Sequence, residues 1–312
     1  MKSKVLTVVA TFNAGPFIAD CLSSLRASSV KTDVLIVDNG STDGTIDTIQ
    51  SKFPEFELII SESNLGFGKA NNIGLRKALE DNYEFAFLLN QDAWIQPETL
   101  NHLISFYKSN PHYGILSPLH LNGSGDAIDP KFSYNLHVRN AAYFDDLLTE
   151  KTKEVYAINF VNAALWLIPL KTLQTVGGFN EYYFMYGEDG DLCERVLYHG
   201  MKIGVVPRAC GHHARYNAYY AKRKALSNVI FTARNWQRWS YEKVTRLSNS
   251  AKQGFLTSIE NVIIGITTNL MKRRFSTAIG IGVGWWFFFF TLPTSLRHRK
   301  LLAQPGPHFI VG

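Results

Sequence analysis

Three short segments of this 312-residue chain place carboxylate and amide side chains beside glycines or directly after an apolar run. They are residues 38–44, 90–92 and 187–192. A carboxylate in such a position can bind a ribose or base, hold a divalent cation, or accept a proton from a reacting hydroxyl. The sequence therefore offers ligand binding, metal binding and general-base chemistry, although each segment also has a simpler structural explanation.

The first segment begins with Asp38, which follows the apolar run at 34–37. Its glycines would let the backbone approach a ligand closely, and the carboxylate could bond to a nucleoside. The competing interpretation is a helix N-cap made by Ser41, Thr42 or Asp43, which needs no ligand. The residues alone leave both interpretations open.

The second segment, Asn90-Gln91-Asp92, directly follows the apolar run at 85–89. Asp92 beside a second oxygen ligand could hold Mg²⁺ or Mn²⁺ bridging a diphosphate, and an ordinary turn before Pro97 is the alternative. Further along, His212 and His213 could supply an imidazole to the same metal or to a phosphate. Adjacent histidines often include one that only packs, so the choice between the two stays open.

The third segment carries Glu188, Asp189 and Asp191 at the expected start of a helix. A helix dipole favours acids there, so a solvated first turn would explain them. The aromatic run at 182–186 instead indicates a pocket lined by aromatic side chains, in which we expect Asp189 to act as the general base.

The elements that must position these segments alternate along the chain. Apolar runs at 5–10, 34–37, 56–60 and 85–89 predict buried parallel strands, and helical spacing at 17–25, 45–53 and 69–79 separates them. Polar loops at 11–16 and 38–44 follow the first two strands, at the edge where such sheets bind ligands. Residues 119–159 lose this periodicity, which favours a lid or an acceptor-facing excursion, and helices are expected again at 189–198 and 219–239.

Composition narrows the class of protein further. Hydrophobic residues make up 46% and charged residues 19%, which is typical of a folded protein. Three scattered cysteines fit a reducing compartment, and export is not expected because the apolar run at 5–9 is too short for a signal peptide. The net charge of +6 is uneven, because residues 201–312 carry 17 Lys/Arg against two Asp/Glu. This basic third predicts an anionic partner.

Residues 275–296 contain no charged side chain and include the aromatic run at 285–290, between cationic clusters at 272–274 and 297–300. This pattern favours an anionic membrane surface over nucleic acid. Three interpretations remain open: a membrane span, an interfacial or re-entrant helix, and a buried core or dimer helix.

Several enzyme classes lose support. The segment at 66–69 lacks P-loop spacing, no GxGxxG follows the first strand, and no GxSxG occurs. A nucleotidyltransferase would need Lys or Arg in the loop at 11–16, which has none.

Five segments taken in order resemble the family 2 glycosyltransferases, particularly their bacterial rhamnosyltransferase-like branch. They lie at 8–13, 37–43, 64–74, 88–92 and 177–195, within a resemblance that spans about residues 5–235. The resemblance implies a GT-A fold, which is an α/β fold with a Rossmann-like, mostly parallel mixed sheet and helices on both faces. We expect this domain at 1–240, with a nucleotide-binding half to 118 and an acceptor-binding half from 119. A basic, apolar helical extension at 241–312 would associate with the membrane.

The resemblance also implies an activity. A sugar, rhamnose being one candidate, would pass with inversion from a dTDP- or UDP-linked donor to a glycan or lipid-linked acceptor in cell-surface polysaccharide biosynthesis. Mn²⁺ or Mg²⁺ would be the cofactor. The expected location is the cytoplasmic side of the bacterial inner membrane, either peripheral or with one embedded C-terminal segment. Nucleic acid is not an expected partner, and homo-oligomerisation is left open. The alternative to an enzyme is a catalytically inactive nucleotide-sugar-binding scaffold at the membrane, which would not need Asp92 and Asp189.

The residue roles implied by the resemblance follow its motifs. Asp189 falls on the position of the base, and Glu188, Asp191 and Trp166 are expected near the acceptor. Asp92 with His213 or His212 would bind the metal. Donor contacts are expected from Thr11, Asn13, Asp38, Asn39, Gly66, Lys69, Asn90 and Gln91. Asn90 stands where the family's DxD motif has its first acid, so only one carboxylate of that motif remains.

Overall fold

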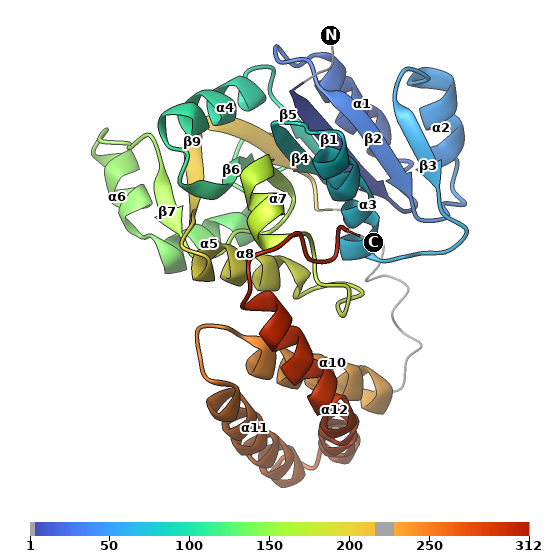
Figure 1. Cartoon of the computed structure of the whole chain (residues 1–312), viewed down its shortest axis with the longest axis vertical. Helices are drawn as coiled ribbons and strands as arrows, with labels where there is room; N and C mark the ends of the chain where they lie inside the picture. Colours follow the sequence, from blue (N-terminus) through green and yellow to red (C-terminus); the bar gives the residue numbers. More distant parts are fainter. Residues whose placement is uncertain (1–3, 216–227, 312) are drawn as a thin grey trace. The chain divides into compact units, whose positions relative to one another are not determined.

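The structure, a computed structural model, describes residues 4–215 and 228–311. They divide into two compact units (Figure 1). Of the described residues, the α/β unit contains 4–215 together with 305–311, and the helical unit contains 228–304. The boundary therefore differs from the expected one at 240, because the helix that contains residue 240 packs with the helices after it.

A nine-stranded mixed sheet forms the centre of the α/β unit, in the order β3-β2-β1-β4-β8-β6-β9-β5, with β7 paired to β9. The first four strands are mutually parallel, whereas β8 runs antiparallel to β4 and β6. The strands are β1 (Val5–Thr11), β2 (Asp33–Asp38), β3 (Glu57–Ile60), β4 (Phe85–Leu89), β5 (Ala93–Ile95), β6 (Tyr113–Leu121), β7 (Tyr156–Ile158), β8 (Leu165–Pro169) and β9 (Lys202–His213). This confirms the predicted mostly parallel half of the sheet.

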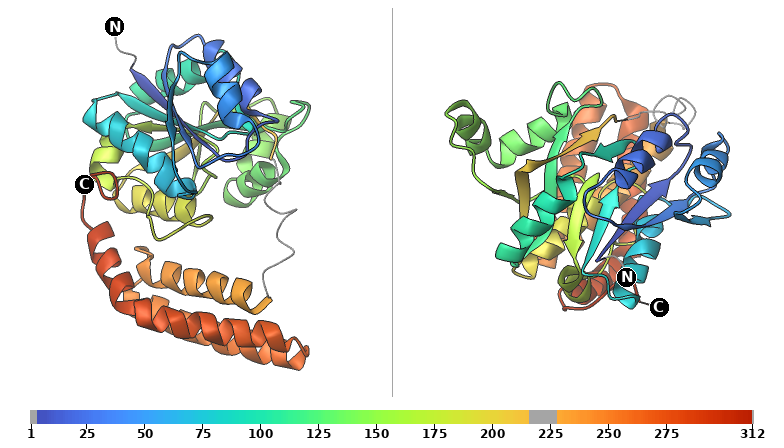
Figure 2. Two further views of the ribbon diagram at one scale, coloured as in Figure 1. Left: turned by 90° about the vertical axis from the view of Figure 1, so that its right-hand side faces the viewer. Right: turned by 90° about the horizontal axis from the view of Figure 1, so that it is seen from above.

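Helices cover both faces of this sheet, as the sequence predicts (Figure 2). In β1, Leu6 and Val8 join one apolar core, while Val5 and Val9 join the other, because side chains alternate along a strand. The helices of this unit are α1 (Ile18–Arg26), α2 (Thr45–Lys52), α3 (Phe67–Glu80), α4 (Thr99–Ser109), α5 (Pro130–Arg139), α6 (Ala142–Leu148), α7 (Leu170–Val176) and α8 (Glu188–Tyr198). The α1, α2 and α4 helices pack on one face, and α3, α7 and α8 on the other.

The segment at 119–159, which the sequence left without a secondary structure, contains the end of β6, α5, α6 and β7. Asp129 caps α5, since its carboxylate accepts a hydrogen bond from the Phe132 N–H at 2.7 Å. Arg215, just after β9, forms an ion pair with the same buried carboxylate. The excursion is therefore tied to the sheet.

The helical unit consists of α10 (Asn228–Thr245), α11 (Ala251–Met271) and α12 (Phe275–Leu302) among the described residues. The helix expected at 219–239 is confirmed from 228 onward, and its first part lies outside the described residues. Pro293 lies inside α12, which is bent (Figure 2). Proline removes one helical hydrogen bond and commonly causes such a bend. By length and composition, α12 is the one helix among residues 4–215 and 228–311 that qualifies as a candidate membrane span.

Candidate active site

Asp38 lies at the carboxyl end of β2 and is completely buried. Its Oδ2 accepts hydrogen bonds from the Thr11 hydroxyl at 2.7 Å and the Ser41 hydroxyl at 2.6 Å. Its Oδ1 accepts from the backbone N–H groups of Gly40 at 3.0 Å and Ser41 at 2.8 Å. Four bonds use most of the acceptor capacity of a carboxylate, so Asp38 joins the loops after β1 and β2. A direct contact between Asp38 and a nucleoside stays a prediction.

Asn13 connects the same two loops. Its backbone N–H donates to the Ser41 hydroxyl at 2.8 Å, and its side-chain oxygen accepts from the Thr42 N–H at 2.9 Å. Asn13 has a φ of 52°, in the left-handed region that Asn tolerates better than most residues. The Asn39 side chain extends the network, accepting from the Leu65 N–H at 3.1 Å. Thr11, Asn13, Asp38 and Asn39, expected together from the sequence, therefore lie in one hydrogen-bonded cluster, the donor-side cluster.

Gln91 links β4 to this cluster. The Phe12 N–H donates to Gln91 Oε1 at 2.6 Å, and Gln91 Nε2 donates to the Phe12 carbonyl at 3.2 Å. The Asn90 backbone N–H bonds to the Ala164 carbonyl at 2.9 Å, which fixes the strand end against β8. The sequence predicted Gln91 as a donor contact and missed its pairing with the loop. The donor contacts of Asn90 and Gln91 remain predictions.

Gly66 lies where the segment before α3 touches the segment before α8. Its φ is 82°, and a Cβ at this position would lie 2.2 Å from the Phe184 carbonyl oxygen, so a side chain does not fit. The Phe67 N–H donates to the same carbonyl at 3.2 Å. Lys69, on the first turn of α3, has its Nζ 3.8 Å from the Glu181 carboxylate and is half exposed. Both predicted donor residues thus lie at this junction.

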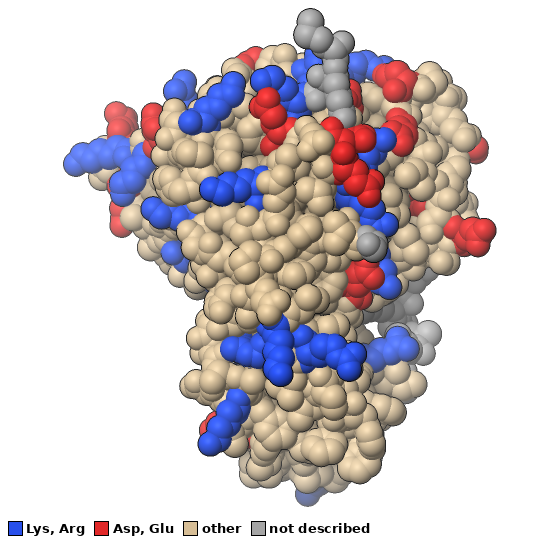
Figure 3. Space-filling model, viewed as in Figure 1, with Lys and Arg blue, Asp and Glu red and all other residues tan. Residues whose placement is uncertain are grey.

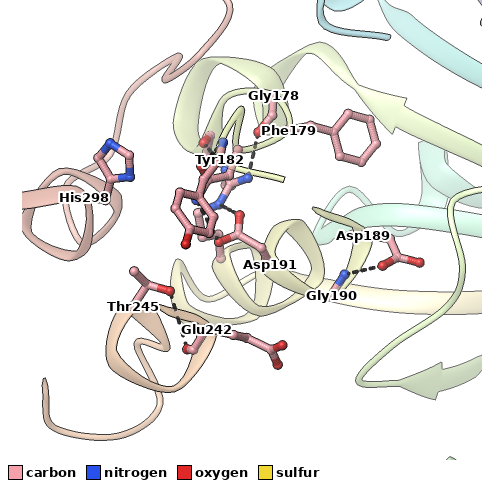
Figure 4. Close-up of polar contacts among 12 residues, drawn as sticks. Gly178, Phe179, Tyr182, Asp189, Gly190, Asp191, Glu242, Thr245 and His298 are labelled. Carbon is pink, nitrogen blue, oxygen red and sulfur yellow. Dashed lines mark hydrogen bonds and ion pairs between the residues drawn. The ribbon is translucent and has the colours of Figure 1, made fainter. Parts of the chain in front are cut away.

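The first turn of α8 carries three acids, Glu188, Asp189 and Asp191, and Figure 4 shows the last two of them. Asp191 points toward Gly178, whereas Asp189 lies on another side of the first turn. Glu188 is buried, and Asp189 is half-buried with its Oδ1 accepting the Gly190 N–H at 2.8 Å. Asp189 thus lies in the first turn of α8 with its carboxylate partly open to solvent.

Asp191 is instead part of a buried ion pair. Arg195 Nε lies 2.8 Å from its carboxylate, and the Arg195 guanidinium also donates to the carbonyls of Val176 at 2.8 Å and Gly178 at 2.7 Å. Asn180 Nδ2 donates to Asp191 at 3.3 Å. Asp191 therefore anchors α8 to the segment after α7, and the structure does not support the acceptor contact expected of it.

Trp166, on β8, also differs from expectation. Its side chain is completely buried and stacks on Phe179, with ring centroids 6.0 Å apart. Its Nε1 is buried and has no hydrogen-bond partner among the described residues. The structure gives Trp166 a packing position, because the inward alternation of β8 directs it into the core, and this placement does not support an acceptor contact.

Asp92 and His213 meet although 121 positions separate them. Their strands pair antiparallel, with Ala93 opposite His213, and His213 Nε2 lies 3.5 Å from Asp92 Oδ1. Strand alternation turns His212 to the other side, where it stacks on Trp94 with centroids 5.3 Å apart. The structure therefore places His213, rather than His212, beside the carboxylate predicted to bind metal.

Asp92 and His213 could supply two ligands to a metal ion. No group of three or more His, Cys, Asp or Glu side chains is arranged for metal binding within residues 4–215 and 228–311. The His213 Nδ1 is buried and has no hydrogen-bond partner in that part of the chain. One carboxylate and one imidazole fit a cation that completes its shell with substrate phosphates and water, as Mg²⁺ commonly does. They do not form a closed protein site.

Comparison with known proteins agrees with this architecture. The fold is that of the GT-A glycosyltransferases: the structure of S. aureus TarS residues 1–349 with UDP-GlcNAc matches 83% of this chain and 72% of that chain, with a TM-score of 0.55 at 18% identity. The mannosyltransferase PcManGT from Pyrobaculum calidifontis, in complex with GDP-Man and Mn²⁺, matches 97% of this chain and 74% of that chain, with a TM-score of 0.51 at 17% identity.

The sequence comparisons define the family. The model for glycosyl transferase family 2 matches residues 7–159, and the model described as the N-terminal domain of galactosyltransferase continues the match over residues 153–222. This chain belongs to glycosyl transferase family 2 and is a glycosyltransferase. The predicted family and enzyme class are therefore confirmed.

Named relatives include two rhamnosyltransferases. N-acetylglucosaminyl-diphospho-decaprenol L-rhamnosyltransferase of Mycobacterium tuberculosis is 28% identical over 267 residues, covering 75% of this chain and 86% of the relative. The dTDP-rhamnosyl transferase RfbF of Shigella flexneri is 21% identical over 208 residues, covering 66% of this chain and 68% of the relative.

Proposed function

We propose that this enzyme transfers a sugar, with inversion of the anomeric carbon, from a dTDP- or UDP-linked donor to a lipid-linked or polysaccharide acceptor. The observation that carries the proposal is the donor-side cluster, in which the loops after β1, β2 and β4 are hydrogen-bonded at the carboxyl edge of the sheet. Open α/β sheets bind nucleotides at this edge. Rhamnose is the first donor sugar to test because two relatives are named as rhamnosyltransferases.

In the proposed reaction Asp189 accepts the proton of the acceptor hydroxyl. As that oxygen bonds to the anomeric carbon, the bond from this carbon to the diphosphate oxygen breaks, and the nucleoside diphosphate leaves with the electron pair. Asp189 is suited to this role because its half-buried carboxylate lies in the first turn of α8, and a carboxylate can accept a proton from a hydroxyl group. Asp191 and Arg195 hold α8 in place, so they position Asp189 without taking part in proton transfer.

Asp92 and His213 are the residues that would hold a divalent cation. Such a cation supplies positive charge to the departing diphosphate. Mn²⁺ is present in the structure of the related mannosyltransferase from Pyrobaculum calidifontis, which supports Mn²⁺ as the first cation to test here.

The proposed location is the cytoplasmic face of a bacterial inner membrane. The name of the mycobacterial relative identifies its acceptor as a decaprenol-linked sugar diphosphate, a molecule with a membrane-embedded chain. The apolar α12 and the basic final third of this chain fit the same setting.

The experiment is a panel of nucleotide-sugars with Mn²⁺ or Mg²⁺, scored for nucleotide release and for sugar transferred to a polyprenyl-diphosphate-linked acceptor. The proposal expects turnover with a dTDP- or UDP-sugar, and its loss in Asp189→Asn. Donor binding without turnover by any donor would instead favour the inactive scaffold. Turnover by Asp189→Asn at the wild-type rate would contradict the role of Asp189.

A further inference from the structure

The helical unit exposes an unusual amount of apolar surface. Of the 26 large hydrophobic side chains that are exposed among the described residues, 16 lie at 228–304. In α12 six of them recur every three or four residues, so they form one stripe about 120° wide along the helix. These residues are Phe275, Ile279, Val283, Trp286, Phe287 and Phe290.

The side of α12 opposite this stripe packs against α10. A Cβ added at Gly280 would lie 2.8 Å from the Val229 carbonyl oxygen, and one at Gly284 would lie 2.2 Å from the Ala233 carbonyl oxygen. These glycines therefore let α12 approach the backbone of α10 closely, as small residues do in packed membrane helices. The exposed stripe is left facing away from the other helices of its unit.

A similar stripe lies on α11. Leu256, Ile263, Ile264 and Met271 are exposed and share one face by helical spacing. Exposed apolar surface on two adjacent helices exceeds what single surface side chains explain in a water-soluble unit.

The charged residues of the helical unit indicate what kind of surface it binds. Residues 228–304 carry eleven Lys/Arg against two Asp/Glu, and cationic clusters at 272–274 and 297–300 bracket the stripe of α12. Figure 3 shows Lys and Arg side chains gathered in a band on the helical unit, with an extended sparsely charged surface beside it. Apolar stripes flanked by cations match an anionic lipid surface, in which each interfacial cation contributes about 1 kcal/mol.

Both ends of the helical unit connect to the α/β unit. Before it, the Ala214 N–H bonds to the Asp92 carbonyl at 2.9 Å. After it, the Gly306 N–H bonds to the Thr175 carbonyl at 2.8 Å, the Gly178 N–H bonds to the His308 carbonyl at 2.9 Å, and Ile310 is completely buried in the core. A compact unit lies on one side of a bilayer, so the chain between 214 and 306 crosses it an even number of times.

Among the described helices, none besides α12 is suited to a second membrane crossing. The α11 helix is long enough, but it is less apolar than α12, and its Glu260 is exposed on the same face as Leu256 and Ile264. A charged side chain facing lipid at the centre of a span is costly. Residues 216–227 are too few for a helical span and contain Lys222, Arg223 and Lys224. A hairpin of two spans would also move the cations at 272–274 to the far side, against the positive-inside rule.

We infer that the helical unit attaches to an anionic membrane without crossing it, with the apolar stripes of α11 and α12 inserted in one leaflet. This inference rests on the membrane location in the proposed function and excludes α12 as a single span. It places residues 272–274 on the same side of the bilayer as the α/β unit.

The topology is tested by cysteine labelling of the full chain expressed in bacteria, with a maleimide that does not cross membranes. Arg273→Cys reports the α11–α12 turn, and Lys108→Cys, exposed on α4, reports the α/β unit. The parent chain, which carries Cys21, Cys193 and the partly buried Cys210, is the control for background labelling, and burial raises the pKa of all three thiols. We expect both variants to label in inside-out vesicles and neither to label in spheroplasts. Labelling of Arg273→Cys only from the spheroplast side would overturn the inference.

Lipid binding is measured separately with purified full-length protein and vesicles with or without phosphatidylglycerol. The double variant Phe287→Ser/Phe290→Ser should bind anionic vesicles at least roughly tenfold more weakly, because two aromatic rings no longer enter lipid. The matched control Tyr134→Ser/Leu148→Ser removes exposed apolar side chains from α5 and α6 and should bind like the parent. If the parent binds no vesicles while it still transfers sugar, the membrane attachment is wrong and the proposed glycosyl transfer stands.

Discussion

The α/β unit and the helical unit differ in how they pair their polar side chains and in how many apolar side chains they expose. In the α/β unit the polar side chains near the proposed site are hydrogen-bonded to one another and to the backbone. Asp38, for example, accepts four such hydrogen bonds. In the helical unit, large apolar side chains remain at the surface, and α12 buries mainly its small-residue face. The first unit is built to hold polar groups in fixed positions in water, and the second has a surface suited to lipid.

Loss of the proposed base, Asp189, should have the largest effect of these changes. It should lower activity without altering the membrane binding expected of the helical unit. We expect Asp189→Asn to lower kcat by about 10²- to 10⁴-fold, because an amide cannot accept the acceptor proton. Vesicle binding should be unchanged. The assay is steady-state sugar transfer, with Asp145→Asn on α6 as a control that keeps the parent rate. A variant that retains a tenth of the parent kcat would contradict the assignment.

Disruption of the donor-side cluster should have the next largest effect. Asp38→Ala leaves four donors, on Thr11, Gly40 and Ser41, without their acceptor. We expect a loss of about 1–3 kcal/mol in the free energy of unfolding and a raised KM for the donor. Urea unfolding and donor titration measure the two effects. Asp47→Ala, an exposed acid on α2, is the matched control. Unchanged stability in Asp38→Ala would show that the network is not formed.

The two neighbouring histidines give a paired test. His213→Gln should raise the Mn²⁺ or Mg²⁺ concentration for half-maximal activity by roughly tenfold or more, because one of two proposed ligands is lost. His212→Gln should change it far less, since His212 stacks on Trp94. The measurement is the activity of each variant as a function of the Mn²⁺ or Mg²⁺ concentration. Equal shifts, or a larger shift in His212→Gln, would remove His213 from the metal site.

The smallest effect is expected at Trp166. Because its indole is buried against Phe179, Trp166→Phe should leave the KM for the acceptor within about twofold and lower stability slightly, by roughly 1 kcal/mol. Acceptor titration together with thermal unfolding separates packing from recognition. A large rise in the KM for the acceptor at unchanged stability would restore the acceptor role.

Much of the fold could be predicted because local patterns determine it. The apolar runs of β1, β2 and β4 and the helical spacing of α1 to α3 identify the parallel half, and polar residues after those strands locate the site edge. The order of the motifs was sufficient to identify the family.

The remainder depends on long-range pairing, which no local pattern contains. The choice between His212 and His213 follows from the register of β5 against β9, and the burial of Trp166 follows from the pairing of β8 with β4. The return of residues 305–311 to the core could not be predicted either, because the apolar run at 309–311 is only three residues long and follows a segment with two prolines. Likewise, the Asp191–Arg195 pair looks in the sequence like any helical i,i+4 pair, and only its burial shows its structural role.

The central claim is that Asp92, His213 and Asp189 serve one reaction centre, and a crystal structure of the full chain with Mn²⁺ and a nucleoside diphosphate tests it most directly. Anomalous scattering should locate manganese within bonding distance of Asp92 and His213, touching the diphosphate, with the Asp189 carboxylate facing the space where the sugar was attached. Manganese bound elsewhere, or an Asp189 that faces away from the diphosphate, would contradict the account.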